Sequence, residues 1–339
     1  MQLSNRISAL TALGNSIRIN MDSDYFQNRI EIAHNHNGWF THDNVCFALA
    51  TIADKFLSAE KLEKWVSAYN LNSIRSKKVG LILAGNIPLV GFHDVLSVFI
   101  SGHHASVKFS SKDKILIPFL LDLLSGIDSE TAEYFSEVEN MKEIDALIAT
   151  GSDNTARYFE YYFRNQPHII RKNRTSVAVL TGNETPADIN NLSFDMFSYF
   201  GLGCRNISKL YVPADFDPVN FLDNLTNPFE VHNHFKYSNN YVYNRTILLM
   251  KKEHHLDNGF ILLKEDTGIH PPLSVIFFEK YNSIPSLISM LDQNREKIQV
   301  IESREKIHGI TTIPFGTAQQ PELWDYADGV DTLKFLSKL

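Results

Sequence analysis

The segment that decides the fold reads Val79-Gly80-Leu81-Ile82-Leu83-Ala84-Gly85-Asn86. Its first six residues are apolar or glycine, with no alternating polar positions. Such a short, uninterrupted run is typical of a strand buried on both faces, as in a parallel sheet. The Gly-Asn pair that follows predicts the turn that ends this strand.

Helical and strand-like patterns alternate after this strand. Residues 91–101 predict a helix, 105–109 a strand, 115–124 a helix, 144–149 a strand and 154–163 a helix. Strands that alternate with helices form βαβ units around a mostly parallel sheet with helices on both faces. The first 70 residues read as helical, and we expect Cys46 there to be a buried core thiol.

The same alternation restarts near residue 175, so a second α/β unit is expected to begin close to Asn173. Its predicted elements are a strand at 177–180, a helix at 189–201, strands at 209–212, 259–264 and 274–278, a helix at 284–292 and a strand at 299–301. The segment 216–257 is polar and rich in Asn, and it receives no assignment.

The composition excludes several functional classes. A length of 339 residues suggests two domains at about 150 residues each. A net charge of −7 argues against a nucleic-acid binder that relies on bulk positive charge. Two cysteines cannot form a disulfide framework, so we expect a reducing, cytoplasmic location. No apolar run reaches the roughly 18 residues of a membrane span, and residues 1–20 lack the apolar core of a signal peptide.

Common catalytic motifs are absent from the sequence. There is no G-x-G-x-x-G, no phosphate-binding loop of the Walker type, no H-E-x-x-H and no G-x-S-x-G. The histidine pairs have no cysteine partners at zinc-like spacing, so no metal site is predicted.

One segment does indicate chemistry, Phe200-Gly201-Leu202-Gly203-Cys204-Arg205. Its glycines allow close approach of a ligand to the backbone, and the N–H of Cys204 then faces a substrate oxygen. Arg205 adjoins the sulfur and favours the thiolate. From these residues alone, Cys204 is either a nucleophile or a structural cysteine.

The Cys204 segment and the turn Ala84-Gly85-Asn86-Ile87-Pro88 together resemble the aldehyde dehydrogenase superfamily, and within it the fatty acyl-CoA reductases of the LuxC type. The resemblance implies that Cys204 is the nucleophile and that the Asn86 side chain lines the oxyanion hole. It also implies two doubly wound α/β domains, a Rossmann-like cofactor domain and a catalytic domain, with the active site between them.

Four further segments carry the same resemblance, in the same order along the chain. The strand that ends in Val107-Lys108-Phe109-Ser110-Ser111 looks like the family strand whose Lys contacts the adenosine ribose. Thr150-Gly151-Ser152 looks like the turn over the dinucleotide, Lys264-Glu265-Asp266-Thr267-Gly268 like the segment whose Glu holds the nicotinamide ribose, and Pro314-Phe315-Gly316-Thr317 like the late "P-F-G" segment.

The resemblance therefore implies cofactor contacts from Lys108, Ser110, Ser111, Gly151, Ser152, Glu265 and Phe315. The alternative for Lys108 and Glu265 is a solvated surface charge, and for Asn86 a plain turn former. The implied domains are 1–172, a helical segment plus the nicotinamide-dinucleotide domain; 173–316, the catalytic domain; and 317–339, a tail that packs back on the body.

Several positions depart from the family pattern. Val179 stands where hydrolytic members carry the Glu that activates water, and Glu184 lies five residues further on, past the turn. The loss of that base suits transfer of the acyl group to or from coenzyme A. Phe109 replaces the usual Pro, and the chain is shorter than typical members, with no evident oligomerisation arm.

The cofactor choice follows from charge. NAD-preferring members often carry an acid three residues after the Lys, where this chain has Ser111 with Lys112 and Lys114 close by. A hydroxyl beside ammonium groups accepts a 2′-phosphate, so we expect NADP, with NAD as the alternative.

Function is expected to be reduction of an acyl-CoA, with a fatty acyl group, to an aldehyde. Acyl groups delivered by a carrier protein or as acyl phosphate, and a non-catalytic scaffold subunit, remain alternatives. A homo-oligomer and partner subunits that activate or transfer acyl groups are both compatible with the resemblance.

Overall fold

The computed structural model describes residues 1–71 and 75–339, which form two compact units. Unit 1 comprises Met1–Asn173 and Pro321–Leu339, and unit 2 comprises Arg174–Gln320. The boundary expected after residue 172 lies one residue from this division, and the one expected after residue 316 lies four residues from it.

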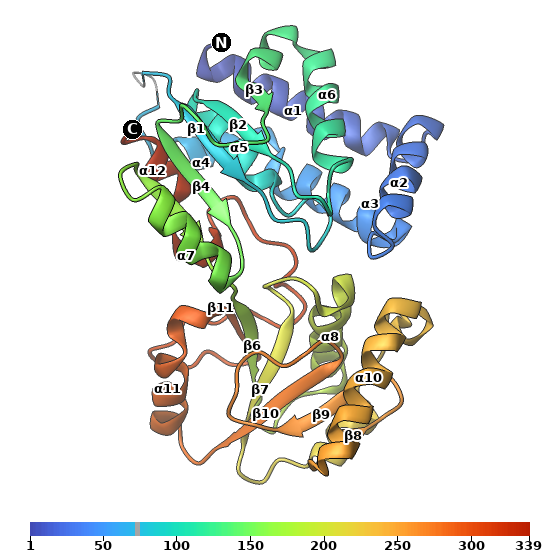
Figure 1. Ribbon diagram of the computed structural model, residues 1–339. Helices are drawn as coiled ribbons and strands as arrows, with labels where there is room; N and C mark the ends of the chain where they lie inside the picture. The colour runs from blue at the N-terminus through green and yellow to red at the C-terminus, as the bar shows by residue number, and fades with distance from the viewer. Residues whose placement is uncertain (72–74) are drawn as a thin grey trace. The chain divides into compact units, whose positions relative to one another are not determined.

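Unit 1 is a parallel sheet covered by helices (Figure 1). Its strands are β1 (Lys78–Ile82), β2 (His104–Lys108), β3 (Phe135–Glu137), β4 (Ala146–Thr150) and β5 (His168–Arg171). Its α-helices are α1 (Leu3–Asn20), α2 (Asp24–His36), α3 (His42–Thr51), α4 (Ala59–Val66), α5 (Phe92–Ser101), α6 (Leu116–Ile127), α7 (Asp153–Tyr162) and α12 (Thr332–Leu336). Short π- and 3₁₀-helical segments lie at η1 (Ile52–Phe56), η2 (Ser129–Tyr134) and η6 (Ala327–Gly329).

The strand order in unit 1 is β3-β2-β1-β4-β5, and every pair is parallel. The chain leaves β1 through α5 toward β2 and β3, then returns to the other side of β1 and continues through α7 to β5. Right-handed crossovers in opposite directions place α5 and α7 on opposite faces. The point of reversal lies between β1 and β4, where sheets of this kind bind ligands beyond the carboxyl ends of the strands.

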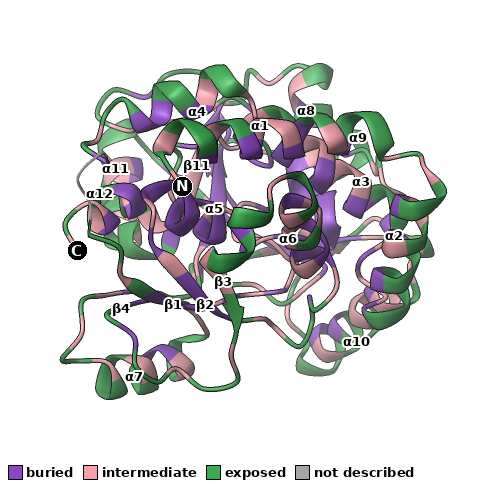
Figure 2. Cartoon of the chain, turned by 90° about the horizontal axis from the view of Figure 1, so that it is seen from above, coloured by how far each residue is buried: buried purple, intermediate pink, exposed green. Residues whose placement is uncertain are grey.

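Burial explains why the β1 segment is so apolar. Val79, Gly80 and Leu81 are buried, and nine of the ten residues of α5 are buried as well. Figure 2 shows β1, β2, β4 and α5 largely in the colour of buried residues, whereas α7 is mostly exposed. A helix buried on nearly every side belongs to a core, and α5 ends at Gly102, whose φ of +86° favours glycine.

Unit 2 holds a six-stranded sheet in the order β11-β6-β7-β10-β9-β8. The strands are β6 (Thr175–Val179), β7 (Ile207–Pro213), β8 (Leu256–Asp257), β9 (Leu262–Glu265), β10 (Val275–Tyr281) and β11 (Ile298–Ser303); β8 alone pairs antiparallel. The α-helices are α8 (Pro186–Phe197), α9 (Pro218–Asn224), α10 (Phe235–Lys251) and α11 (Ile284–Gln293), with 3₁₀ segments η3 (Ser198–Gly201), η4 (Val231–Asn233) and η5 (Arg295–Lys297).

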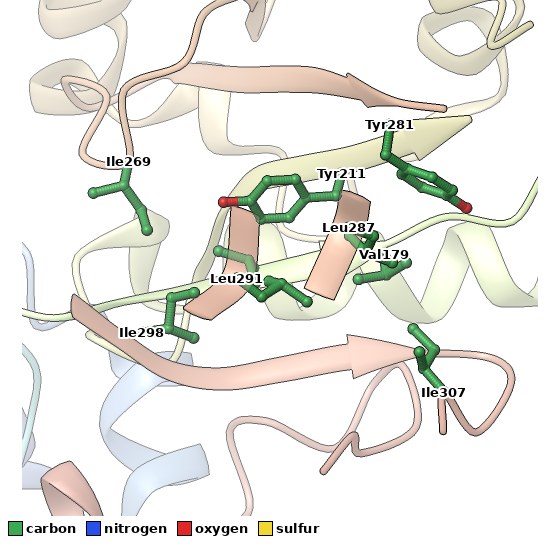
Figure 3. Close-up of a cluster of buried hydrophobic side chains, with 9 residues drawn as sticks. Val179, Tyr211, Ile269, Tyr281, Leu287, Leu291, Ile298 and Ile307 are labelled. Atoms are coloured by element: carbon green, nitrogen blue, oxygen red, sulfur yellow. The ribbon is translucent and has the colours of Figure 1, made fainter. Parts of the chain in front are cut away.

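One face of this sheet is closed by α11. Leu287 and Leu291 on α11 pack with Val179, Tyr211 and Ile298 in a buried cluster. Figure 3 shows Leu291 beneath the Tyr211 ring and Leu287 beside Val179. Full burial of one such leucine stabilises a fold by about 2 kcal/mol, so this cluster anchors α11 on the sheet.

The α/β fold class with parallel sheets is confirmed, but two local predictions are wrong. The helix expected at 189–201 ends at Phe197, because Tyr199 and Phe200 have φ values of 50° and 60°. The unassigned segment 216–257 contains α9 and α10. Cys46 is partly exposed rather than buried, with its Sγ 3.7 Å from Nε2 of His42.

Within the described ranges of the chain, no helix is long and apolar enough to cross a membrane.

Candidate functional site

Cys204 lies in the turn between η3 and β7, in unit 2. Its thiol is free of disulfides and partly exposed. The turn follows three left-handed residues, Tyr199, Phe200 and Gly201, with φ values of 50°, 60° and 78°. Glycine adopts this conformation readily, but two buried aromatic residues in it are strained. The shape of the turn is therefore imposed by its surroundings and not by local preference.

Asn206 is the residue that holds this turn. Its side chain is 2% exposed, and its Oδ1 accepts the N–H of Gly203 at 2.7 Å. Its Nδ2 donates to the backbone carbonyls of Asp195 and Ser198, both at 2.8 Å. Asn206 thus ties the residue before Cys204 to the end of α8. Sequence reasoning missed it, because a lone Asn shows its importance only through burial.

A second contact anchors the turn to the sheet. The Oγ of Ser176, in β6, donates to the carbonyl of Cys204 at 3.0 Å, and the Ser176 N–H donates to the carbonyl of Asn206 at 3.3 Å. The carbonyl side of Cys204 is consequently fixed against β6.

The residue that the resemblance places at the water-activating Glu is Val179, which is apolar. Val179 ends β6 and is fully buried. Glu184 lies in the following turn, where its carboxylate accepts the N–H and hydroxyl of Thr181 at 2.6 and 3.0 Å and the N–H of Gly182 at 3.0 Å. Through these three hydrogen bonds, the Glu184 carboxylate stabilises the turn.

In unit 1, the loop that carries Asn86 follows β1 and packs on the loop that follows β2. A Cβ on Gly85 would lie 2.6 Å from Oγ of Ser110, so only glycine fits at this approach. The buried carboxylate of Asp113 accepts the N–H of Leu89 at 2.9 Å and so joins the two loops. Asn86 itself is half-buried. Asp113 has no sequence signal, since its partners are backbone groups.

The segment after β2 presents positive charge. Lys108, Ser111, Lys112 and Lys114 are all exposed. The acid in this segment, Asp113, is 2% exposed and turned inward, and burial raises its pKa to about 6. The exposed surface of the segment is therefore cationic.

Gly151 and Ser152 follow β4, the strand next to β1. A Cβ on Gly151 would lie 3.1 Å from Cβ of Thr155 and 3.2 Å from Phe159, so glycine allows α7 to pack close to the strand. Ser152 is the N-cap of α7 and accepts the N–H of Thr155 at 3.3 Å. The positive end of the α7 dipole thus lies at the carboxyl end of the sheet.

Glu265 ends β9 and is exposed. The loop after it, residues 266–268, is held by the fully buried ammonium group of Lys209. Lys209 Nζ donates to the carbonyls of Asp266, Thr267 and Gly268 at 3.3, 3.0 and 2.9 Å and forms an ion pair with Glu279. The sequence places Lys209 on an apolar strand but does not reveal this role.

Phe315 is 5% exposed, in the turn after Ile313. Gly316 has a φ of +83°, and a Cβ there would lie 3.1 Å from that of Asn191. Phe315 belongs to unit 2 and is buried, and its contact with a cofactor stays a prediction.

The predicted residues thus form two groups. Asn86, Lys108, Ser110, Ser111, Gly151 and Ser152 lie at the carboxyl ends of neighbouring strands of unit 1. Cys204, Glu265 and Phe315 lie in unit 2. Among the side chains that the structure describes, no group of three or more His, Cys, Asp or Glu residues is placed to hold a metal ion.

No family model and no curated protein matches this sequence. Solved structures do resemble the fold. Aldehyde dehydrogenase 21 from Physcomitrella patens, solved with succinate, superposes with a TM-score of 0.65 at 14% identity over 90% of this chain and 74% of that one. The NAD⁺ complex of a Bacillus cereus aldehyde dehydrogenase gives a TM-score of 0.66 at 13% identity, over 89% and 72% of the two chains.

A third similar structure is a mutant of the propionaldehyde dehydrogenase from the fucose utilisation microcompartment of Clostridium phytofermentans. Its TM-score is 0.60 at 9% identity, over 90% of this chain and 79% of that one. At these identities the likeness establishes the fold and not the activity. The chain has the fold of the aldehyde dehydrogenases, with a Rossmann-like unit and a unit that corresponds to their catalytic domain.

Proposed function

We propose that this protein is an acyl-CoA reductase, which converts a fatty acyl-CoA to an aldehyde through an acyl-cysteine at Cys204. The observation that carries the proposal is a partly exposed thiol on a turn braced by the buried Asn206, together with an apolar Val179 where hydrolytic relatives carry a base. The first feature favours a positioned nucleophile. The second disfavours water as the acceptor of the acyl group.

The chemical step suits a thiolate, which is both a good nucleophile and a good leaving group. The Cys204 sulfur attacks the thioester carbonyl, a new S–C bond forms, and the bond to the coenzyme A sulfur breaks, so that coenzyme A departs as a thiolate. The acyl group then stays on Cys204 as a thioester.

Negative charge develops on the carbonyl oxygen during this attack, and it needs donors that are already in place. The proposed donors are the N–H of Cys204 and the amide of Asn86. The carbonyl of Cys204 is held by Ser176 and the N–H of Gly203 is held by Asn206, so the backbone on both sides of the Cys204 N–H is constrained. Asn86 lies in a loop held by Asp113, so its backbone is also constrained.

Water is a poor acceptor in this proposal because a base is missing. The carboxylate nearest in sequence, Glu184, already accepts three hydrogen bonds from residues 181 and 182. Its use as a base would break the turn that it forms. The acyl-enzyme would therefore persist until the acyl group is reduced or transferred back to coenzyme A.

The residues at the sheet edge of unit 1 fit a nicotinamide dinucleotide. Gly151 gives close packing of α7 on the strand, and the α7 N-terminus offers N–H groups to phosphate. Lys108 would hold the adenosine ribose and Glu265 the nicotinamide ribose. When bound, the reduced cofactor supplies the hydride that converts the acyl group to an aldehyde and frees Cys204.

NADPH is the cofactor that the charge distribution favours. Ser111 is exposed between Lys108 and Lys112, and the carboxylate of Asp113 points inward. A 2′-phosphate would meet ammonium groups on this segment, whose own acid, Asp113, is buried.

The test is a reduction assay with a panel of acyl-CoA chain lengths and with either cofactor, using Cys46→Ala as the cysteine control. We expect cofactor oxidation and aldehyde with long-chain acyl-CoA in the wild type and in Cys46→Ala. Activity only with an acyl carrier protein or an acyl phosphate would identify that compound, and not acyl-CoA, as the acyl donor. No acylation of Cys204 by any of them would refute it.

A further inference from the structure

A pair of buried carboxyl groups lies behind the nucleophile turn, and nothing in the proposed chemistry uses it. Asp195, in α8, and Glu302, in β11, are each 0% exposed. The two side chains lie within hydrogen-bonding range of each other. Yet Asp195 Oδ1 and both oxygens of Glu302 have no donor among the described residues.

Two ionised carboxylates at this range, both fully buried, would repel strongly and lack donors. A single proton shared by the pair removes the repulsion between two negative charges and supplies a hydrogen-bond donor. Burial raises the pKa of both carboxyl groups, and that of Glu302, which also has Asp195 beside it, lies well above its usual range. One carboxyl group of the pair would therefore carry a proton, and its O–H would donate to the other carboxylate.

Each partner is tied to a different part of unit 2. Asp195 Oδ2 accepts the N–H of Ala318 at 3.3 Å, and the N–H groups of Gly316 and Gln319 also favour its charge. Glu302 lies on β11, where it pairs with Ile313 at the start of the same loop. The carboxyl pair therefore closes the loop 314–319 onto α8.

The same stretch of α8 holds the nucleophile turn. The backbone carbonyl of Asp195 accepts from Asn206 Nδ2 at 2.8 Å, and Asn206 Oδ1 accepts the N–H of Gly203. One residue, Asp195, thus touches the 314–319 loop through its side chain and the Cys204 turn through its carbonyl.

We propose that Asp195 and Glu302 share one buried proton and act as positioning residues, which lock the loop 314–319 to the helix end that holds the Cys204 turn. The groups that face the pair are each other and the N–H groups of residues 316, 318 and 319. The link to catalysis rests on the proposed function of Cys204. The contact between the loop 314–319 and α8 lies within unit 2 and is measured without substrate.

Separation of the loop 314–319 from α8 exposes the carboxyl pair to water. A solvated carboxyl group is ionised at neutral pH, so the shared proton is then released. The opening equilibrium, and with it the exchange of the Ala318 amide, must then increase about tenfold per pH unit beyond the intrinsic chemical exchange. Glu302→Gln keeps a donor to Asp195 but has no proton to release, so its exchange should not show this increase.

Hydrogen–deuterium exchange of the full chain between pH 6 and 9 tests the proposal. We expect the pH-dependent loss of protection at 314–319 in the wild type and in Glu305→Gln, an exposed control three residues away. We expect no such loss in Glu302→Gln. Parallel pH profiles in wild type and Glu302→Gln would overturn the shared proton.

Coupling to the nucleophile turn has its own readout. Glu302→Ala should speed exchange at least tenfold in both 314–319 and 202–206, and Glu302→Gln should restore wild-type protection in both. A change at 314–319 alone would overturn the positioning role. If Glu302→Ala does not fold, Asp195→Asn is measured instead. The introduced amide donates to an ionised Glu302, so the pH dependence of exchange should vanish while the protection of 314–319 is retained.

Failure of acyl-CoA turnover leaves these exchange results standing, because no substrate is present. The two hypotheses are therefore refuted by different measurements.

Discussion

Replacement of Asn206 by Ala should loosen the nucleophile turn more than any other single change near Cys204. The side chain makes three hydrogen bonds in a buried site, to Gly203, Asp195 and Ser198. Truncation leaves three backbone groups without these partners, and each such loss costs slightly more than about 1 kcal/mol. The expected loss in the unfolding free energy of unit 2 is therefore about 3–4 kcal/mol.

Urea unfolding followed by far-UV circular dichroism measures this loss. With an m-value of about 2 kcal/mol per molar urea, the midpoint of unit 2 should fall by about 1.5–2 M. The three tryptophans, Trp39, Trp65 and Trp324, all lie in unit 1, so their fluorescence reports the other unit. The matched control is Asn239→Ala, since Asn239 is exposed on α10.

A midpoint for Asn206→Ala within about 0.3 M of the Asn239→Ala control would refute the reasoning, because three buried hydrogen bonds cannot vanish at so small a cost. A normal midpoint together with unchanged alkylation of Cys204 by iodoacetamide would show that the turn is held by other contacts.

Two further changes test the cofactor segment. Ser111→Glu should shift preference toward NADH by about tenfold or more, since it places a carboxylate against a 2′-phosphate; fluorescence titration with both cofactors measures the ratio, and an NADH preference already present in the wild type would contradict the assignment. Asp113 is buried with a pKa near 6, above its unfolded value of 3.8, so its contribution to stability is complete below about pH 4 and is lost as the pH rises to 6. Relative to Asp113→Asn, the wild type should lose about 3 kcal/mol of unfolding free energy over that window, and equal slopes in unfolding curves would count against it.

The alternation of strands and helices was predictable because each element in the core has a simple burial pattern. β1 is apolar from Val79 to Ile82 because it is a central strand with neighbours on both sides, and α5 is rich in apolar residues because nine of its ten residues are buried. The amino-acid composition of such segments therefore indicates that they are buried.

Helix α10 escaped prediction for the opposite reason. Its inner face, with Tyr237 and Leu248, is buried, but Val242, Tyr243 and Met250 on the outer face are more than half exposed. Apolar residues on both faces, interrupted by asparagines, leave no helical period for a sequence pattern to reveal. The end of α8 was missed because the left-handed Tyr199 and Phe200 oppose their own backbone preference.

The candidate site was predictable only where chemistry and glycine turns mark it. Cys204, Asn86 and Gly151 belong to segments with recognisable turns, whereas Asn206, Asp113 and Lys209 carry no local signal. Each of these three is a buried polar side chain that satisfies backbone groups distant in sequence or across a turn. Their importance arises from tertiary burial, which a single sequence does not display.

The most direct test of the central claim is the mass of the protein after mixing with a long-chain acyl-CoA in the absence of cofactor. The wild type and Cys46→Ala should each gain one acyl group, and Cys204→Ala should gain none. The adduct should persist in water, since general-base assistance worth about 10²–10⁴-fold is missing, and it should disappear quickly when coenzyme A is added. An adduct on Cys204→Ala, or steady release of free acid from the wild type that Glu184→Gln abolishes, would contradict the account.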